Sequence, residues 1–361
     1  MSVGISLSQF ISDNPDPLSS GIPELDQALN NGFQTRSIYE VYGPPGIGKT
    51  RFGLQLLEHT DPRDRLLWIE TFKPMPGVAP ATLAAGRKIE KVKITTFTEL
   101  FFFINALDTS YRLLVMDGMS QLVCNHLYVL QKRAKRSPAH SSNPSSTASW
   151  KLHEMKCKHL VQLFTSMTKY ANQHNTTIIL LNDCMNTSFT NDDVNTGIHE
   201  DGLDVIADKT NFYVISAAKR RNVQILKSSL LASSVAMGKR DAKWEIFLKK
   251  KIGLFWGWQT TAPLATGTDH TTKAETAATT GATASTSTKP RKCRLVIVNT
   301  GKRSRHDADN GDSERGSLQR ICTEFDQNGR LRSLNAQNSS QVPKTDTASD
   351  EFVFDSQSSV V

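Results

Sequence analysis

The chain has 361 residues, enough for roughly two average domains, but only 38% of them are hydrophobic, which is low for a fully folded chain. Its 43 lysines and arginines outnumber its 35 aspartates and glutamates, giving a formal net charge of +8. No apolar run is long enough to cross a bilayer, the N-terminus lacks the features of a secretory signal, and the five cysteines are widely spaced. We therefore expect a soluble, intracellular, reduced protein with no membrane partner.

Short β-rich runs alternate with helical patterns over residues 1–259. The expected strands, in chain order, are Ile38–Tyr42, Leu66–Ile69, Val92–Thr95, Leu113–Met116, Ile178–Leu181 and Val223–Leu226. Trp150–His174 is the longest expected helix. This alternation predicts an α/β fold, a mostly parallel sheet with helices on both faces. Trp244–Leu248 and Ile252–Trp256 flank a lysine turn and are expected to form a terminal hairpin.

The composition changes after residue 259. Residues 261–290 hold 11 threonines and 7 alanines, and Leu264 is their only large apolar side chain, so they cannot bury enough surface to offset their ordering entropy. The apolar patch at 295–298 is too isolated to build a core. We therefore predict a core over 1–259 and a disordered tail over 260–361. Within the core, residues 134–149 have no periodicity and are expected to form a surface insertion.

The strongest motif is a phosphate-loop pattern, G-x-x-x-x-G-K-[ST], between an expected strand and an expected helix. It reads Gly43-Pro44-Pro45-Gly46-Ile47-Gly48-Lys49-Thr50. The backbone N–H groups of such a loop, together with the helix N-terminus, bind phosphates. Lys49 is expected to reach the β- and γ-phosphates and Thr50 to bind Mg²⁺. The alternative, a chance glycine-rich turn, is disfavoured by the complete motif in this context.

A second magnesium ligand and a catalytic base are expected at the ends of neighbouring strands. Asp117 directly follows Leu113–Met116 and is the expected second ligand; the alternative is an ordinary strand-ending aspartate. The residue after Asp117 is a glycine, so a catalytic base must come from another strand. Glu70, at the end of Leu66–Ile69, is the candidate that would activate the attacking water. A solvated strand-end acid is the equal alternative for Glu70.

Basic clusters are candidates for contact with a nucleic-acid backbone, and the alternative for each is solvated surface charge. They are Lys132–Arg136, Lys219–Arg221, Lys239–Arg240 and Lys249–Lys251. A set of cysteines and histidines contains no paired C-x-x-C, so we expect no metal site there. Its members are Cys124, His126, His153, Cys157 and His159.

The segment before the phosphate loop reads SSGIPELDQALNNGF from Ser19 to Phe33 and leads through Thr35–Gly43 directly into the loop. It resembles the opening of RecA/RadA-type recombinase cores, and the resemblance covers nearly all of 17–257. Three further stretches are similar to the fungal recombinase paralogues of the mediator type, which pair with a sister paralogue. They are Trp68–Phe72, Leu181–Asn186 and Val235–Gly238.

The chain also departs from the strand-exchanging members of that family. Only about twenty residues precede the core, and Phe10–Asp13 lacks the alanine of the F-x-x-A hook. The family's pattern D-T-E-G-T-F-R-P, which follows the strand before the catalytic base, is shortened here to Glu70–Pro74. Glu70 can therefore be aligned with the aspartate of that pattern or with its catalytic glutamate. The family's Asn-Gln after the fourth strand is Asn182-Asp183 here. These differences affect ATP hydrolysis and self-filament formation more than nucleotide binding.

The resemblance implies an ATP- and Mg²⁺-binding paralogue that forms a heterodimer with a sister paralogue. It further implies that the pair binds single-stranded DNA and stabilises the recombinase filament during homologous-recombination repair in the nucleus. The loop 186–211 matches the family's second DNA-binding loop in position but is acidic, so Lys219, Arg220 and Arg221 are the expected DNA contacts.

Two other functions remain open. They are a DNA-dependent ATPase that itself exchanges strands, and a basic P-loop module whose partner is not DNA. Residues 289–305 carry seven positive charges and no negative ones and are a candidate nuclear-import signal.

Overall fold

The structure is a computed structural model that describes residues 16–77, 87–136, 146–188, 203–207, 212–218, 222–232, 243–259, 291–299 and 318–334. The helices are α2 (Pro23–Ala28), α3 (Lys49–His59), α5 (Phe97–Ala106), α6 (Met119–Arg136), α7 (Ser146–His174), α8 (Ser229–Ala232) and the 3-10 helix η2 (Lys243–Phe247). The strands are β1 (Ser37–Gly43), β2 (Arg65–Glu70), β3 (Lys88–Lys93), β4 (Leu113–Asp117), β5 (Thr177–Ser188), β6 (Leu203–Ala207), β7 (Phe212–Ala218), β8 (Asn222–Ser228), β9 (Leu248–Gln259), β10 (Arg291–Asn299), β11 (Leu318–Phe325) and β12 (Leu331–Ser333).

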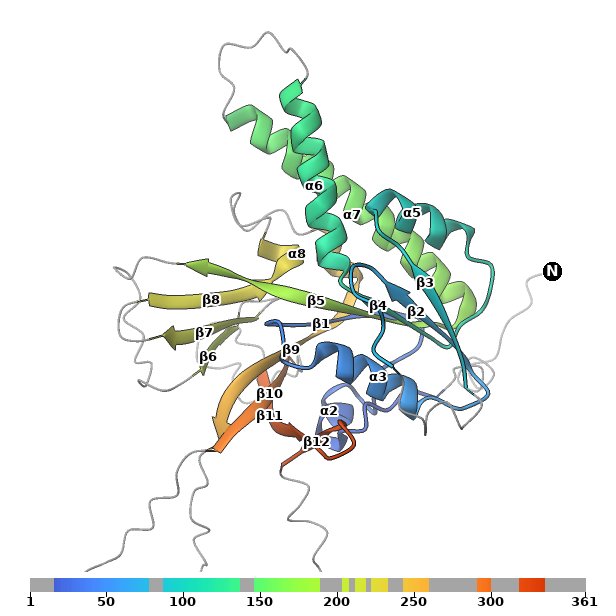
Figure 1. Cartoon of the computed structure of the whole chain (residues 1–361), viewed down its shortest axis with the longest axis vertical. Helices are drawn as coiled ribbons and strands as arrows, with labels where there is room; N and C mark the ends of the chain where they lie inside the picture. Colours follow the sequence, from blue (N-terminus) through green and yellow to red (C-terminus); the bar gives the residue numbers. More distant parts are fainter. Residues whose placement is uncertain are drawn as a thin grey trace, which may run out of the picture.

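The main sheet has the strand order β12-β11-β10-β9-β1-β5-β4-β2-β3. Strands from β9 to β3 in this order pair in parallel, so their carboxyl ends meet at one edge of the sheet (Figure 1). At this edge Gly43 is in register with Asp183, and Glu70 with Asp117. Ligands of open α/β sheets bind outside the carboxyl ends of the strands, so the topology brings the predicted site residues to the expected place.

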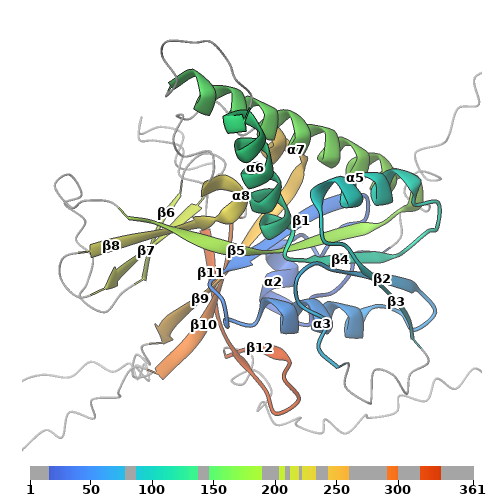
Figure 2. The same cartoon turned by 45° about the horizontal axis from the view of Figure 1, so that its top comes forward.

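Helices cover both faces of this sheet (Figure 2). Trp68 of β2 belongs to a buried cluster that includes Phe52 of α3, on the face covered by α2 and α3. The preceding residue, Leu67, belongs to the cluster on the opposite face, which includes Phe164 of α7. Side chains alternate between the two faces along a strand, and here both faces are buried, which explains the nearly continuous apolar runs in the sequence. The predicted α/β fold is confirmed.

Strand β5 is longer than predicted and belongs to two sheets. Its first part pairs with β1, whereas Cys184–Ser188 pairs antiparallel with β8, which continues to β7 and β6. Figure 2 shows these strands projecting beyond the main sheet. The sequence predicted Ile178–Leu181 and Val223–Leu226 but neither β6 nor β7.

The predicted terminal hairpin is not formed by the two segments expected. The lysines 249–251 lie inside strand β9 rather than in a turn, and most of Trp244–Leu248 is the helix η2. The strand accommodates these lysines because Lys251, whose side chain is 9% exposed, forms an ion pair with Glu245. The antiparallel partner of β9 is instead β10, beyond residues 260–290.

The expectation that 260–361 is one disordered tail is wrong for residues 291–299 and 318–334. Strand β10 pairs with β9 and β11, and β11 pairs with β12, so these strands extend the main sheet. Val296, Ile297 and Val298 are fully buried. The patch looked isolated because its partners, β9 and the buried Ile321 of β11, are distant in the sequence.

The predicted insertion 134–149 is largely helical at both ends. Helix α6 continues to Arg136 and α7 begins at Ser146, so only 137–145 lie outside the described residues. Both helices extend away from the sheet (Figure 1). No helix in the described ranges is both long and apolar enough to span a membrane.

Candidate functional site

The phosphate loop connects β1 to α3 at the carboxyl edge of the parallel strands, as predicted. Its first glycine is required by a close approach, since a Cβ on Gly43 would lie 2.1 Å from the Leu254 carbonyl oxygen. Gly48, with φ of +113°, adopts a backbone conformation that other residues rarely adopt. A Cβ on Gly46 would meet no atom within 4 Å, so the loop faces open space at this point. The loop therefore has both the backbone shape and the room that a phosphate chain needs.

The amine of Lys49 is folded back into the phosphate loop. Its Nζ donates hydrogen bonds to the carbonyl oxygens of Gly43 at 2.8 Å and Pro44 at 3.1 Å. The same Nζ lies 2.9 Å from a carboxylate oxygen of Asp183, which directly follows Asn182 in β5. The Lys49 side chain is 9% exposed, whereas that of Asp183 is 50% exposed. The cation predicted to bind phosphates is thus held in the loop by two carbonyls and one carboxylate.

Thr50 and Asp117 lie side by side, as the predicted magnesium ligands should. The Thr50 hydroxyl donates to Oδ2 of Asp117 at 2.8 Å. Burial, the largest influence, raises the pKa of Asp117, while the bond from Thr50 and the charge of Lys49 lower it. A hydroxyl and one carboxylate suit Mg²⁺, which usually keeps several waters and takes its other ligands from substrate phosphates.

The described residues contain no group of three or more His, Cys, Asp or Glu side chains placed to hold a metal. Of the Cys/His set considered in the sequence, His126 and His159 contact each other at 2.9 Å, and His126 also stacks on Phe97.

Glu70 lies at the end of β2, on the same sheet edge as Asp117. Its Oε1 accepts a hydrogen bond from the backbone N–H of Met75 at 2.7 Å, which closes the turn after β2. This contact gives Glu70 a role in the turn. Its assignment as a catalytic base stays a prediction.

A buried polar network behind the loop was not expected from the sequence. The Asn182 side chain accepts from Ser120 N and donates to Glu40, which also accepts from the Ser228 hydroxyl. Burial raises the pKa of Glu40, which is completely buried in β1. The Ser229 hydroxyl donates to the Asp183 carbonyl, so the network joins the phosphate-loop edge to the start of α8. The only signal in the sequence was an acid in the middle of an apolar strand.

The predicted DNA contacts are not placed by the structure. Lys219, Arg220 and Arg221 lie outside the described residues, between β7 and β8. Most of the loop 186–211 and the pair Lys239–Arg240 also lie outside them. Lys132 and Arg133 are exposed on α6.

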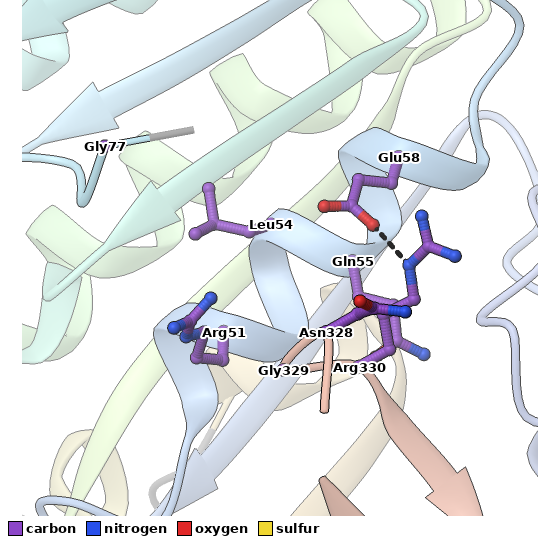
Figure 3. Close-up of a pocket in the computed structure, with 8 residues that line it drawn as sticks. All are labelled: Arg51, Leu54, Gln55, Glu58, Gly77, Asn328, Gly329 and Arg330. Carbon is purple, nitrogen blue, oxygen red and sulfur yellow. Dashed lines mark hydrogen bonds and ion pairs between the residues drawn. The ribbon is translucent and has the colours of Figure 1, made fainter. Parts of the chain in front are cut away.

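The C-terminal strands supply contacts to this site that sequence reasoning missed. Arg294 of β10 donates from Nε to the Ile47 carbonyl oxygen in the phosphate loop at 2.9 Å. The turn after β11 packs on α3, where Arg330 forms a 2.8 Å ion pair with Glu58. A small pocket lies between α3 and this turn (Figure 3). It is lined by Arg51, Leu54, Gln55, Glu58, Gly77, Asn328, Gly329 and Arg330.

Comparison with known proteins gives three similarities. Residues 18–63 match a family model described as "ATPase: KaiC". Over 280 residues the chain is 44% identical to the DNA repair protein RAD55 of Saccharomyces cerevisiae, an alignment that covers 72% of this chain and 65% of that protein. A crystal structure of the RadB recombinase matches with a TM-score of 0.39 and 14% identity, covering 88% of this chain and 99% of that one. The last similarity is too low to support an inference.

The sheet order and the phosphate loop show a P-loop α/β core, and residues 18–63 of this core match an ATPase family model. The predicted resemblance to the recombinase paralogues is confirmed by the 44% identity. The match of residues 18–63 to an ATPase family model indicates a nucleotide site with Mg²⁺, and Lys49, Thr50 and Asp117 have the geometry for it.

Proposed function

We propose that this chain is an ATP-binding recombinase paralogue that acts as a mediator in homologous-recombination DNA repair. It pairs with a sister paralogue, binds single-stranded DNA and promotes or stabilises the recombinase filament. The observation that carries the proposal is the 44% identity to a protein described as a DNA repair protein. The preserved phosphate loop supports the nucleotide-binding part of the proposal.

In the proposed function, ATP binds with its phosphates on the loop and its Mg²⁺ beside Thr50 and Asp117. Bound Mg²⁺ supplies positive charge that neutralises the phosphates. Lys49 adds a second positive charge from inside the loop, and Asp117, next to the Thr50 hydroxyl, offers a carboxylate oxygen to the ion. All three residues stand where the phosphate loop meets the sheet edge.

Hydrolysis of ATP is proposed to be weak or absent. One oxygen of Glu70, the candidate base, already accepts a hydrogen bond from the Met75 backbone. A carboxylate offers about four acceptor sites, so this bond still leaves room for the attacking water, and it is the shortened pattern at Glu70–Pro74 that argues against turnover.

The DNA contacts are proposed at Lys219, Arg220 and Arg221, and the place of action is the nucleus. The candidate import signal 289–305 overlaps strand β10, in which Arg294 is stacked between aromatic rings. An import receptor must contact the basic side chains directly, and the side chain of Arg294 is engaged in the contacts of β10. The proposed nuclear location therefore rests on the repair function and on the basic residues of the signal after 299.

The proposal is tested by DNA binding at several salt concentrations, with the chain alone and with the sister paralogue recovered by pull-down. Each phosphate contact to single-stranded DNA contributes about −0.7 to the slope of log K against log salt. Replacing Lys219, Arg220 and Arg221 together by alanine should therefore make the slope shallower by about 2. A matched control replaces Lys88, Lys91 and Lys93, which lie in the edge strand β3.

ATP turnover with and without single-stranded DNA separates the remaining alternatives. Strong DNA-stimulated turnover that Glu70→Gln abolishes would contradict the proposal and identify an ATPase that itself exchanges strands. No salt-dependent DNA binding, even with the sister paralogue present, would instead support a P-loop module with another partner.

A further inference from the structure

The side chain of Arg294 connects strand β10 to the phosphate loop. Its Nε donates to the Ile47 carbonyl oxygen at 2.9 Å. Its guanidinium carbon lies 4.4 Å from the ring centroid of Trp256 and 4.4 Å from that of Phe325. A planar guanidinium stacks well on aromatic faces, and two rings fix its orientation. Arg294 is therefore held in place to bond one particular carbonyl of the loop.

Phe325 contacts the next residue of the loop. A Cβ on Gly48 would lie 2.4 Å from the Phe325 ring, so the ring occupies the space that any other residue would need. The C-terminal strands thus contact the loop at Ile47 and Gly48, directly before Lys49.

The same strands also hold the helix that follows the loop. Gln55 of α3, which is 2% exposed, bonds both the backbone N–H and the carbonyl of Leu331. Near the C-terminal end of α3, Glu58 is paired with Arg330 (Figure 3). The loop and its helix are therefore attached to one layer formed by β10, β11 and β12.

The bond from Arg294 determines where a neighbouring amide points. A peptide unit is planar and trans, so its C=O and N–H point in opposite directions. Since Arg294 bonds the Ile47 carbonyl, the Gly48 N–H of the same peptide unit points to the opposite side, away from Arg294. Amides in this loop bind phosphates, and a loop already held in its binding shape loses less conformational freedom when the ligand binds.

We propose that Arg294 is a positioning residue of the nucleotide site, and that strands β10 and β11 hold the phosphate loop in its binding shape before nucleotide arrives. The proposal rests on the nucleotide binding proposed above. Arg294 acts through the loop and need not touch the ligand. The effect therefore extends to any chain of phosphates, with or without a nucleoside.

The test uses the full-length chain and two probes, a fluorescent ATP analogue and inorganic tripolyphosphate as its competitor. Arg294→Ala should weaken both probes by about tenfold, because the loop must then order itself on binding. Arg294→Lys keeps the charge but lacks the stacked Nε donor, and should remain at least threefold weaker than wild type. Arg332→Ala is the matched control, since it removes an exposed arginine that is paired with Asp326 in the same layer.

Hydrogen exchange of the peptides covering residues 43–50 gives a readout that needs no nucleotide. Faster exchange is expected in Arg294→Ala than in wild type, with Arg332→Ala unchanged. If Arg294→Ala does not fold, Phe325→Leu, which keeps apolar volume but removes the ring, should show the same faster exchange and weaker binding.

Unchanged exchange together with unchanged phosphate affinity in Arg294→Ala would overturn the proposal. Full restoration of binding by Arg294→Lys would also overturn it, because charge alone would then account for the effect. A wild-type chain that binds neither probe would refute the proposed nucleotide binding, while the exchange comparison would still decide whether Arg294 holds the loop.

Discussion

Asp183 competes with the nucleotide phosphates for the amine of Lys49. Lysine has three hydrogen-bond donors, and those of Lys49 are directed to Gly43, Pro44 and Asp183. Phosphate must displace at least one of these acceptors to reach the amine. Asp183 is the only charged one, and its carboxylate would also repel a γ-phosphate. We therefore predict that Asp183→Asn binds ATP more tightly than the wild-type chain.

The size of the effect follows from the geometry of the ion pair. At 2.9 Å, two unit charges attract by about 1.4 kcal/mol at the dielectric constant of water and by about 6 kcal/mol at an effective value of 20. The Asp183 side chain is 50% exposed, so the lower end applies, and pairs of this kind contribute about 1 kcal/mol or less. A release of about 1 kcal/mol corresponds to roughly fivefold tighter binding. ADP should gain less, because it lacks the γ-phosphate.

The assay is competition of ATP and ADP against a fluorescent ATP analogue at two salt concentrations. The advantage of Asp183→Asn should shrink at high salt, because salt screens exposed charges. Glu90→Gln is the control: its carboxylate is 44% exposed and pairs with Arg65 at the edge of the sheet. Equal or weaker ATP binding by Asp183→Asn, with Glu90→Gln unchanged, would refute the competition.

Three further predictions concern single residues. Lys49→Ala should reduce ATP binding by at least tenfold, since it removes the cation from the loop; unchanged binding in the same titration would contradict the phosphate-loop assignment. Gln55→Leu should lower the free energy of unfolding by about 3 kcal/mol in urea denaturation, because three buried hydrogen bonds to Ser20 and Leu331 are lost, whereas a loss below about 1 kcal/mol would show that these groups find other partners. Burial lowers the pKa of Lys156 to about 8, against 10.5 in an unfolded chain, so between these two pH values the unfolded state binds more protons than the folded state. The free energy of unfolding of the wild-type chain should therefore rise with pH in this range relative to that of Lys156→Met. A difference between the two chains that does not change with pH would contradict this pKa shift.

The site residues that belong to a continuous motif or directly follow an apolar strand could be predicted from the sequence. Lys49 and Thr50 belong to a continuous motif, and Asp117 follows an apolar strand, so each was identified without knowledge of the fold. Their contacts also followed, because parallel strands carry their last residues to the same edge. Glu70 was correctly placed at that edge, but its bond to Met75 depends on the turn that follows, which the sequence pattern did not determine.

The contacts made by the C-terminal strands could not be predicted in this way. Arg294 and Ile47 are 247 residues apart, and Gln55 and Leu331 are 276 apart, so no local period or motif connects them. The composition of residues 261–290 suggested that everything beyond them was disordered as well. The three consecutive lysines 249–251 suggested a turn because charged residues are rare inside a buried strand. The ion pair that allows Lys251 to lie inside β9 cannot be recognised from the hydropathy of the sequence.

The contact between Arg294 and Ile47 also has a consequence for the order of events during synthesis. Ribosomes add about 5–20 residues per second, so a separation of 247 residues corresponds to roughly 12–50 s between the synthesis of the phosphate loop and that of the arginine that holds it. A nascent chain therefore carries the complete motif long before its outer contacts exist. A chain that stops anywhere between residues 50 and 290 would keep every residue of the motif, yet by this reasoning its loop would have to order itself around each nucleotide that it binds.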